Sequence, residues 1–191
     1  MTTAGAPPGR VLVVWCPGWP EPADPDAVRA FERVVSLVEE LCPRVEVLHP
    51  GACAIGARGP ARYFGGEEAL AGKIVEAVTG GGFACQAGVA DGLFAARLAA
   101  RSAAPGTATM VPPGQAREFL APYPVSVLDS EGMTLDGGEM TELLPRLGIV
   151  TLGDFARLPA SQAVNRFGVP GGAAHRLARG LDPRPLAARP P

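Results

Sequence analysis

Aromatic side chains are scarce in this sequence. Only 6% of its 191 residues are Phe, Trp or Tyr, whereas 47% are hydrophobic. A core must therefore be built mainly from Ala, Val and Leu, which is adequate for a folded protein. The 25 glycines and 21 prolines are scattered rather than periodic, which excludes a collagen-like chain. We expect one large domain, or one medium and one small domain.

Long apolar runs are also lacking. The most apolar strand-like run, residues 11–15, is far shorter than the roughly 20 residues that cross a membrane. Residues 1–9 lack the basic region and apolar stretch of a secretion signal. The sequence therefore predicts a cytoplasmic protein whose N-terminus, residues 1–9, is flexible.

Metal-binding spacing is missing as well. The four cysteines form no C-x-x-C pair, and only His49 and His175 are available to join them. Zinc sites need clustered Cys and His ligands, so we predict no metal and no cofactor. The cysteines are expected to be reduced and buried.

Charge is unevenly distributed along the chain, whose net charge is −2. Residues 1–138 hold ten Lys and Arg against fifteen Asp and Glu, a balance of −5, whereas residues 139–191 hold seven Arg against four acids, a balance of +3. A basic segment suits contact with phosphates, although ordinary solvated helix faces explain it equally well.

The periodicity of the first 128 residues alternates between strands and helices. It predicts strands at 11–15, 45–49, 53–57, 83–90 and 107–111, and helices at 25–42, 66–78, 91–100 and 115–120, with Asp24 and Asp91 as N-caps. This order predicts an α/β (α+β) fold with a ferredoxin-like split βαβ topology. We assign the domain to residues 10–128, followed by a linker at 129–138.

The segment 143–168 reads as short helices joined by a tight turn. Gly148 and Gly153 permit the bend, and Thr151 lies between them. Backbone N–H groups freed at such a turn can hold a phosphate without reading sequence, whereas the alternative is a plain packing turn between two helices. We assign residues 139–183 to a small helical domain and residues 184–191 to a flexible tail.

A glycine and acid motif, Gly65-Gly-Glu-Glu-Ala69, resembles the signature of diguanylate cyclases. In those enzymes the motif occupies a hairpin between strands, whereas here the two Glu begin a predicted helix. Acids are favourable at the positive end of a helix dipole, so we expect a structural role.

Two segments together resemble the Y-family DNA polymerases. Residues 83–101, FACQAGVADGLFAARLAAR, are similar to the strand and helix that this family writes as GIA-x-N-K-x-x-AKxAS. Residues 144–158, with Phe167-Gly168 and residues 177–182, are similar to its thumb, which contains a helix-hairpin-helix-like turn. The resemblance implies a palm followed by a thumb.

Two shorter motifs resemble one branch of that family. Residues 62–70, RYFGGEEAL, and Trp19-Pro20 are most similar to ImuB, a UmuC-like accessory protein of bacterial mutagenic repair. The resemblance implies an SOS mutagenesis role, with a RecA-like companion protein and an error-prone replicative-type polymerase as partners. The sliding clamp is a less secure partner.

The carboxylates that the family uses for catalysis are not found at the matching positions. Y-family palms hold two Mg²⁺ ions through an Asp at the end of the first strand and an Asp-Glu pair on a later hairpin. Here Trp15 and Pro17 take the first positions, and Gly51-Ala52 take the later ones. We also expect the fingers and little-finger parts to be missing. The resemblance therefore predicts a palm with no catalytic residues, which is not an enzyme.

The resulting hypothesis is an accessory or scaffold protein in DNA damage tolerance and translesion synthesis. The residues predicted to contact DNA are Gly148, Thr151, Gly153, Arg166, Arg176 and Arg179. Two alternatives stay open. One is an active nucleotidyltransferase that uses a displaced metal site at Asp91, Asp129 or Asp136, and the other is a protein-interaction module with no DNA role.

Overall fold

An apolar strand near the start of the chain forms the centre of a sheet. The computed structural model describes residues 9–19, 24–130, 138–182 and 184–187. Within these residues five strands form one sheet in the order β2-β3-β1-β4-β5. The strands are β1 (Arg10–Trp15), β2 (Val45–His49), β3 (Ala52–Gly56), β4 (Gln86–Asp91) and β5 (Ala108–Met110). The pairs β1–β3, β1–β4 and β2–β3 are antiparallel, and β4–β5 is parallel. The order of the first four strands confirms the ferredoxin-like prediction.

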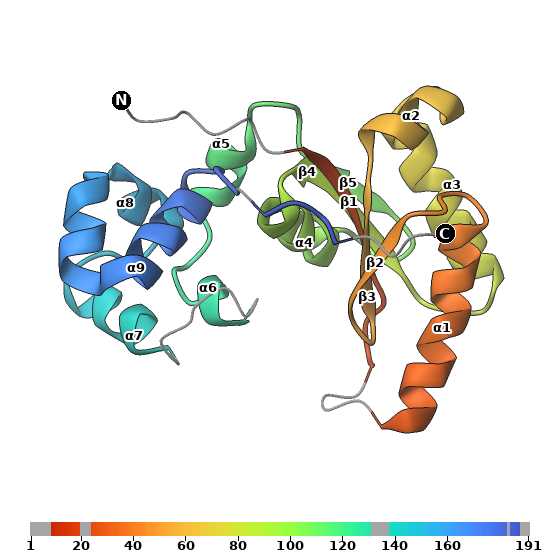
Figure 1. Cartoon of the computed structure of the whole chain (residues 1–191), viewed down its shortest axis with the longest axis horizontal. Helices are drawn as coiled ribbons and strands as arrows, with labels where there is room; N and C mark the ends of the chain where they lie inside the picture. The colour runs from red at the N-terminus through yellow and green to blue at the C-terminus, as the bar shows by residue number, and fades with distance from the viewer. Residues whose placement is uncertain (1–8, 20–23, 131–137, 183, 188–191) are drawn as a thin grey trace. The chain divides into compact units, whose positions relative to one another are not determined.

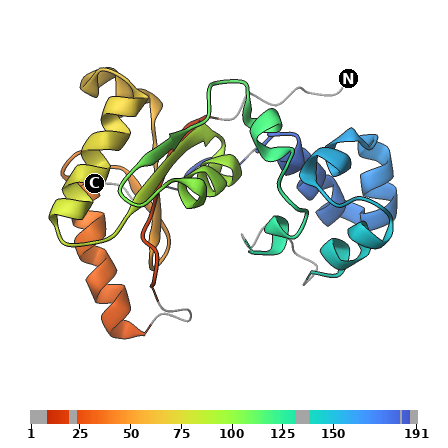
Figure 2. The same ribbon diagram turned by 180° about the vertical axis from the view of Figure 1, so that it is seen from behind.

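Helices cover both faces of this sheet. They are α1 (Pro25–Glu39), α2 (Arg58–Phe64), α3 (Glu67–Gly80) and α4 (Leu93–Ser102). Figures 1 and 2 show α1 and α3 on one face and α4 on the other. Gly88 on β4 allows the close approach of α4, because a Cβ there would lie 2.1 Å from the backbone nitrogen of Ala100.

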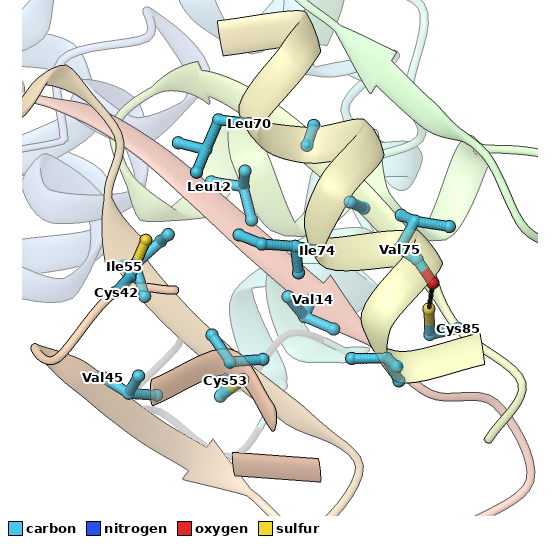
Figure 3. Packing of buried hydrophobic residues seen from close by; sticks show 14 of the residues in the cluster. Leu12, Val14, Cys42, Val45, Cys53, Ile55, Leu70, Ile74, Val75 and Cys85 are labelled. Atoms are coloured by element: carbon cyan, nitrogen blue, oxygen red, sulfur yellow. Dashed lines mark hydrogen bonds between the residues drawn. The ribbon is translucent and has the colours of Figure 1, made fainter. Parts of the chain in front are cut away.

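Alternate residues of β1 point into the core between the sheet and α1 and α3. Leu12 and Val14 pack there with Leu70 and Ile74 of α3, as Figure 3 shows. The four cysteines are free and buried, as predicted, and the Cys85 thiol donates to the Val75 carbonyl at 3.7 Å. Small aliphatic side chains thus supply most of the core that the scarcity of aromatics required.

Local signals explain the first helix but not the second. Asp24 caps α1 by accepting a hydrogen bond from the Ala27 amide at 2.7 Å, and Pro25 occupies the first turn, as predicted. The sequence did not predict α2, because Gly59 and Pro60 read as helix breakers although proline fits a first turn.

The predicted N-cap at Asp91 is wrong. The N-cap of α4 is Gly92, which has no side chain to bond the helix. The Asp91 carboxylate instead accepts a hydrogen bond from Arg10 at 3.3 Å. The carboxylate that was expected to cap the helix is thus engaged by a charge-assisted hydrogen bond with Arg10.

A second compact unit, residues 114–183, is helical. Its helices are α5 (Ala116–Leu120), α6 (Val127–Ser130), α7 (Glu139–Arg146), α8 (Leu152–Arg157) and α9 (Ala160–Ala178). The sequence placed its start at residue 139, whereas α5 and α6 belong to it in the structure. The backbone joins these helices to the rest of the unit. The Leu152 amide donates a hydrogen bond to the Tyr123 carbonyl, and the Gly153 amide donates one to the Ala121 carbonyl. Residues 131–137 of the predicted linker lie outside the described residues.

The end of the described chain returns to the sheet unit, which comprises residues 1–113 and 184–191. Glu46 of β2, only 6% exposed, pairs with the Arg184 guanidinium and accepts a hydrogen bond from the Ala187 amide at 2.6 Å. Two residues of the predicted flexible tail, Arg184 and Ala187, are therefore bonded to strand β2. No helix among the described residues is long and apolar enough to cross a membrane.

Candidate functional site

The ends of β1 and β3 meet at the place where the resemblance predicted the metal positions. Trp15 is the register partner of Ala52, and the Cys16 amide donates to the Gly51 carbonyl at 2.7 Å. The structure therefore brings together the two groups of positions that the sequence comparison had matched separately. The antiparallel register of the β2–β3 hairpin against β1 causes this meeting.

A cavity of about 300 Å³ lies at these strand ends. Two tryptophans and two residues that can carry positive charge contribute to its wall. The lining residues are Trp15, Cys16, Gly18, Trp19, His49, Pro50, Gly51 and Arg101. The Arg101 guanidinium lies over the Trp15 ring, 5.3 Å from its centroid. The sequence analysis did not identify Arg101, because nothing in the pattern of α4 shows that its last turn reaches the end of β1.

Trp19 is held in this wall by aromatic neighbours. Its ring meets Phe31 edge to face at 5.3 Å and stacks on Phe83 at 6.3 Å. Gly51 lies directly beneath it, since a Cβ on Gly51 would be 3.0 Å from the Trp19 Cβ. These contacts fix one wall of the cavity.

The lining does not fit the Mg²⁺ that the resemblance implies. Mg²⁺ prefers carboxylate and water oxygens, but among the described residues that line this cavity, which exclude 20–23, none is an acid. Burial, followed by the nearby Cys85, raises the pKa of the Cys16 thiol to about 12, so this side chain is not a thiolate at neutral pH. We therefore derive no reaction step through a metal ion.

The carboxylates proposed for a displaced metal site have other partners. Asp91 is bonded to Arg10, and Asp129 accepts a hydrogen bond from the Thr141 hydroxyl. Asp136 lies outside the described residues. Among the residues that are described, no group of three or more His, Cys, Asp or Glu side chains is placed to hold a metal.

The Glu67 carboxylate of the glycine and acid motif is part of a buried network. Glu67 begins α3, as predicted, and accepts a hydrogen bond from the Arg10 Nε at 2.9 Å. Arg10 also donates to the Val111 carbonyl at 2.9 Å. The hydrogen bond to Glu67 is the main reason why the pKa of Arg10 is raised. The motif therefore joins β1, α3 and β4 and has a structural role, as the sequence analysis expected.

In the helical unit, the turn at Gly148 closes α7. Gly148 has a φ of +77°, its amide donates to the Pro145 carbonyl, and the Ile149 amide donates to the Leu144 carbonyl, each at 3.0 Å. This pattern is a Schellman motif. The amides that the sequence analysis expected to be free are bonded within the protein.

At the start of α8, a capping box binds the backbone amides. The Thr151 hydroxyl accepts from the Asp154 amide at 3.1 Å, and the Asp154 carboxylate accepts from the Thr151 amide at 3.0 Å. The hydrogen bond from the Thr151 amide is the largest cause that lowers the pKa of Asp154, and a hydrogen bond with the Thr151 side chain is the next. Since the Gly153 amide donates to Ala121, the structure provides no free amides at this turn for a phosphate. The contact of Gly148, Thr151 and Gly153 with DNA stays a prediction, and free backbone amides do not support it.

A second bend lies within α9. Gly168 has a φ of +65° and a ψ of −154°, and Pro170 follows it. Gly171 is buried against the preceding turn, because a Cβ there would lie 2.4 Å from the Phe167 Cβ. Arg166 is exposed two residues before the bend. The kink at Phe167-Gly168 was not predicted from the sequence.

A buried histidine near the end of α9 is influenced by the charges of three exposed arginines. His175 is 2% exposed, and its Nε2 donates to the Leu158 carbonyl at 2.8 Å. Burial lowers the pKa of His175, and the charges of Arg179, Arg117 and Arg176 lower it further. These arginines are exposed, and none has an ion pair among the described residues. The sequence predicted Arg176 and Arg179 but missed Arg117, which lies 59 positions before Arg176 in the chain.

Sequence comparison relates the chain to DNA polymerases. No family model matches it. A DNA polymerase IV from Methanoculleus marisnigri is 36% identical over 101 residues, which are 53% of this chain and 27% of that protein. A DNA polymerase IV from Dehalococcoides mccartyi is 29% identical over 156 residues, which are 81% of this chain and 39% of that protein. The chain thus spans well under half of the length of these relatives.

Solved structures show the same fold. The DinB family error-prone DNA polymerase from Sulfolobus solfataricus matches 93% of this chain and 68% of its own, with a TM-score of 0.71 and 16% identity. The post-insertion binary complex of Dbh DNA polymerase matches 85% of this chain and 47% of its own, with a TM-score of 0.68 and 19% identity. At these identities the likeness establishes the fold.

These comparisons correct one prediction. The sequence analysis concluded that the chain is not an enzyme, whereas the matched relatives carry the name of an enzyme, DNA polymerase IV. The residues at Trp15 and Gly51-Ala52 alone therefore do not establish that the chain lacks activity. The chain has the fold of Y-family polymerase domains, and its curated homologues are DNA polymerases.

Proposed function

We propose that this chain is the palm and thumb part of a Y-family polymerase-like protein that binds primer–template DNA during tolerance of DNA damage. The fold supports this proposal, since solved polymerase–DNA complexes are among the structures that it matches. The curated relatives, named DNA polymerase IV, support a context of translesion synthesis.

The observation that carries the proposal is the cluster of Arg117, Arg176 and Arg179. Each of the three is exposed. A Cβ on Gly180, the neighbour of Arg179, would lie 3.0 Å from the backbone nitrogen of Arg117, so the end of α9 and the start of α5 share one region of the helical unit. In addition, α9 contains no Asp or Glu between residues 160 and 178. Arginine binds phosphate oxygens through a planar fork of donors, and such contacts hold a DNA backbone without reading its sequence.

Within this family, we propose the ImuB branch. The motifs at residues 62–70 and at Trp19-Pro20 support it. On this proposal the partners are a RecA-like companion protein and an error-prone replicative-type polymerase, and the setting is SOS mutagenesis. A pull-down from damaged bacterial cells tests the partners, and recovery of neither protein would contradict this assignment.

The experiment that tests DNA binding is a titration of a fluorescently labelled primer–template by the full chain, followed by anisotropy at several salt concentrations. We expect binding at low salt that weakens as salt rises, because phosphate contacts release counterions. Absence of binding at low salt would favour the alternative of a protein-interaction module. A duplex of unrelated sequence should bind equally well, since the arginines contact the backbone.

A second candidate, nucleotidyl transfer, is favoured by the name that the curated relatives share. Primer extension by the full chain, with Mg²⁺ and deoxynucleotides, tests it. Template-dependent addition supports this candidate, and no addition under conditions where the primer–template is bound contradicts it.

A further inference from the structure

We propose that the outer edge of β5 and the adjoining face of α3 bind an extended peptide of a partner protein. The peptide adds to the sheet as a further strand and places an apolar side chain in the groove between β5 and α3. This site lies within the sheet unit. It goes beyond the proposed function, because it involves neither DNA nor any residue of the helical unit.

The edge of the sheet at β5 offers backbone groups for pairing. β5 is the last strand in the order of the sheet, and β4 is its neighbour. The Thr107 carbonyl accepts a hydrogen bond from Ala87 of β4 at 3.0 Å, and the Val111 amide donates one to β4 at 2.8 Å. Because the backbone groups of successive residues in a strand point to opposite sides, those of Ala108 and Met110 point away from β4. No described residue bonds these outward N–H and C=O groups, so an extended chain can pair with them.

A groove of about 510 Å³ lies beside this edge, between α3 and the start of β5. Its wall is made mostly of small residues, which leave room for a side chain from outside. The lining residues are Gly72, Val75, Glu76, Thr79, Gly80, Gly106, Thr107 and Ala108. Those from α3 recur every three or four positions, so they form one face of the helix. Ala108 and Met110 pack against the core on the α3 side of the sheet, and alternate side chains of a strand added beside them would point to the same side. Such side-chain pockets beside a paired edge give strand addition its specificity.

One charged side chain selects the ligand. Glu76 is exposed and is the one titratable group among the lining residues, and it has no ion pair in the part of the chain that is described. A Lys or Arg in the added strand would complement this carboxylate. The groove therefore fits a peptide in which apolar and polar residues alternate and one polar residue is basic. A second copy of this chain fits less well, because residues 102–113, which include β5, contain no Lys or Arg.

A library of random eight-residue peptides displayed on phage, selected on the immobilised full chain, provides the probe. We expect enriched sequences in which apolar and polar residues alternate and which include Lys or Arg. One enriched peptide is then labelled with a fluorophore and titrated with the full chain, and its anisotropy is followed. No enrichment, or enrichment of peptides that lack both the alternation and the basic residue, would overturn the proposal.

Methylation of single backbone nitrogens of that peptide tests strand pairing without altering the protein. An N-methyl group removes one donor, so it should weaken binding about fivefold or more where the N–H faces β5. Since successive N–H groups of a strand face opposite sides, the effect should recur at every second position. Equal effects at all positions would contradict the addition of a strand.

Variants of the chain test the groove. Gly72→Leu should fill it, since nothing lies within 4 Å of a Cβ at this position, and should weaken peptide binding about tenfold or more. Ala69→Leu is the matched control, because Ala69 is exposed on the same helix and lies outside the groove. Glu76→Gln should have a smaller effect, roughly twofold to fivefold, because it removes one exposed charge pair. Equal binding by Gly72→Leu and Ala69→Leu, both folded by circular dichroism, would contradict the assignment.

A proline on the edge strand tests the backbone and distinguishes a partner from a second copy. Ala108→Pro removes an N–H that points away from β4, so it should keep the pairing with β4 and weaken peptide binding about fivefold or more. We expect the parent and Ala108→Pro to sediment alike without peptide. A dimer that Ala108→Pro dissociates would assign the edge to a second copy and overturn the proposal. Failure of the primer–template titration leaves the peptide result intact, so the proposed function and this proposal can fail separately.

Discussion

One arginine of the sheet unit and three arginines of the helical unit differ in burial and in partners. In the sheet unit, Arg10 is 7% exposed and is bonded to Glu67, Asp91 and the Val111 carbonyl. In the helical unit, Arg117, Arg176 and Arg179 are exposed and have no ion pair among the described residues. A bonded, buried guanidinium stabilises the fold, whereas an exposed one can bind an external anion.

This difference shows why net charge alone does not locate an interface. By sequence, residues 139–191 are basic and the remainder of the chain is acidic. Residues 114–183, the helical unit that the structure defines, hold six arginines and eight acids, so the unit as a whole is not basic. Its positive charge is local, because α5 packs against Gly180 just after α9 and so brings Arg117 to the end of that helix.

The largest expected effect is the loss of the buried arginine. Arg10→Met should lower the free energy of unfolding of the sheet unit by about 3–5 kcal/mol, because it leaves two carboxylates without their partner. Tryptophan fluorescence during urea unfolding measures this, since both tryptophans lie in that unit.

The control for this variant is Arg29→Met. Arg29 pairs with Asp26 on the surface, where the two side chains are 76% and 91% exposed. Its removal should cost about 0.5 kcal/mol or less. If Arg10→Met and Arg29→Met lower the free energy of unfolding equally, the buried ion pairs of Arg10 do not stabilise the sheet unit more than a surface pair does.

The packing of α4 on β4 gives the next largest effect. Gly88→Ala should destabilise the sheet unit by about 2–3 kcal/mol, because the new Cβ would lie 2.1 Å from the Ala100 nitrogen and 2.5 Å from the Ala96 carbonyl oxygen. The same fluorescence measurement detects it. Gly72→Ala in α3 is the control, since nothing lies within 4 Å of its Cβ and alanine favours a helix by roughly 0.5–1 kcal/mol. A neutral Gly88→Ala would show that α4 is not packed on β4 as described.

In the helical unit the capping box has a smaller effect. Thr151→Ala should cost about 1 kcal/mol of stability, because the Asp154 amide loses its acceptor. Thr151→Ser keeps the hydroxyl and should lose much less. Far-ultraviolet circular dichroism during thermal unfolding measures the helical transition. If the alanine and serine variants are equally stable, the Thr151 hydroxyl does not cap α8.

The smallest effect is a dependence on pH. Burial lowers the pKa of His175 in the folded protein below its ordinary value of 6.5, so the neutral form is favoured by folding. Its contribution is therefore fully present above pH 6.5 and is lost as pH falls through the lower pKa of the folded state. Circular dichroism melts between pH 8 and pH 5 should show this loss, which His175→Gln should reduce and the control His49→Gln should leave unchanged. Equal pH profiles for the parent and His175→Gln would contradict this account.

Local patterns predicted most of the strands and helices but not the contacts between them. The Asp24-Pro25 start of α1 and the hairpin at Pro50-Gly51 follow from nearest-neighbour chemistry, and both were predicted. The pairing of Arg10 with Asp91 depends on partners 81 positions apart, and no local signal reveals it. Arg101 at the cavity and Arg117 beside α9 were missed for the same reason.

The most direct test of the central claim compares two triple variants in the primer–template titration. One replaces Arg117, Arg176 and Arg179 with alanine, and the control replaces three exposed arginines of the sheet unit, Arg44, Arg58 and Arg62. Each removes three charges, so they alter net charge equally. We predict that the first lowers affinity and reduces the salt slope by about 0.9 for each phosphate that is no longer neutralised, whereas the control keeps the parent slope. Equal slopes for the two variants would contradict the claim that the helical unit presents its arginines to DNA.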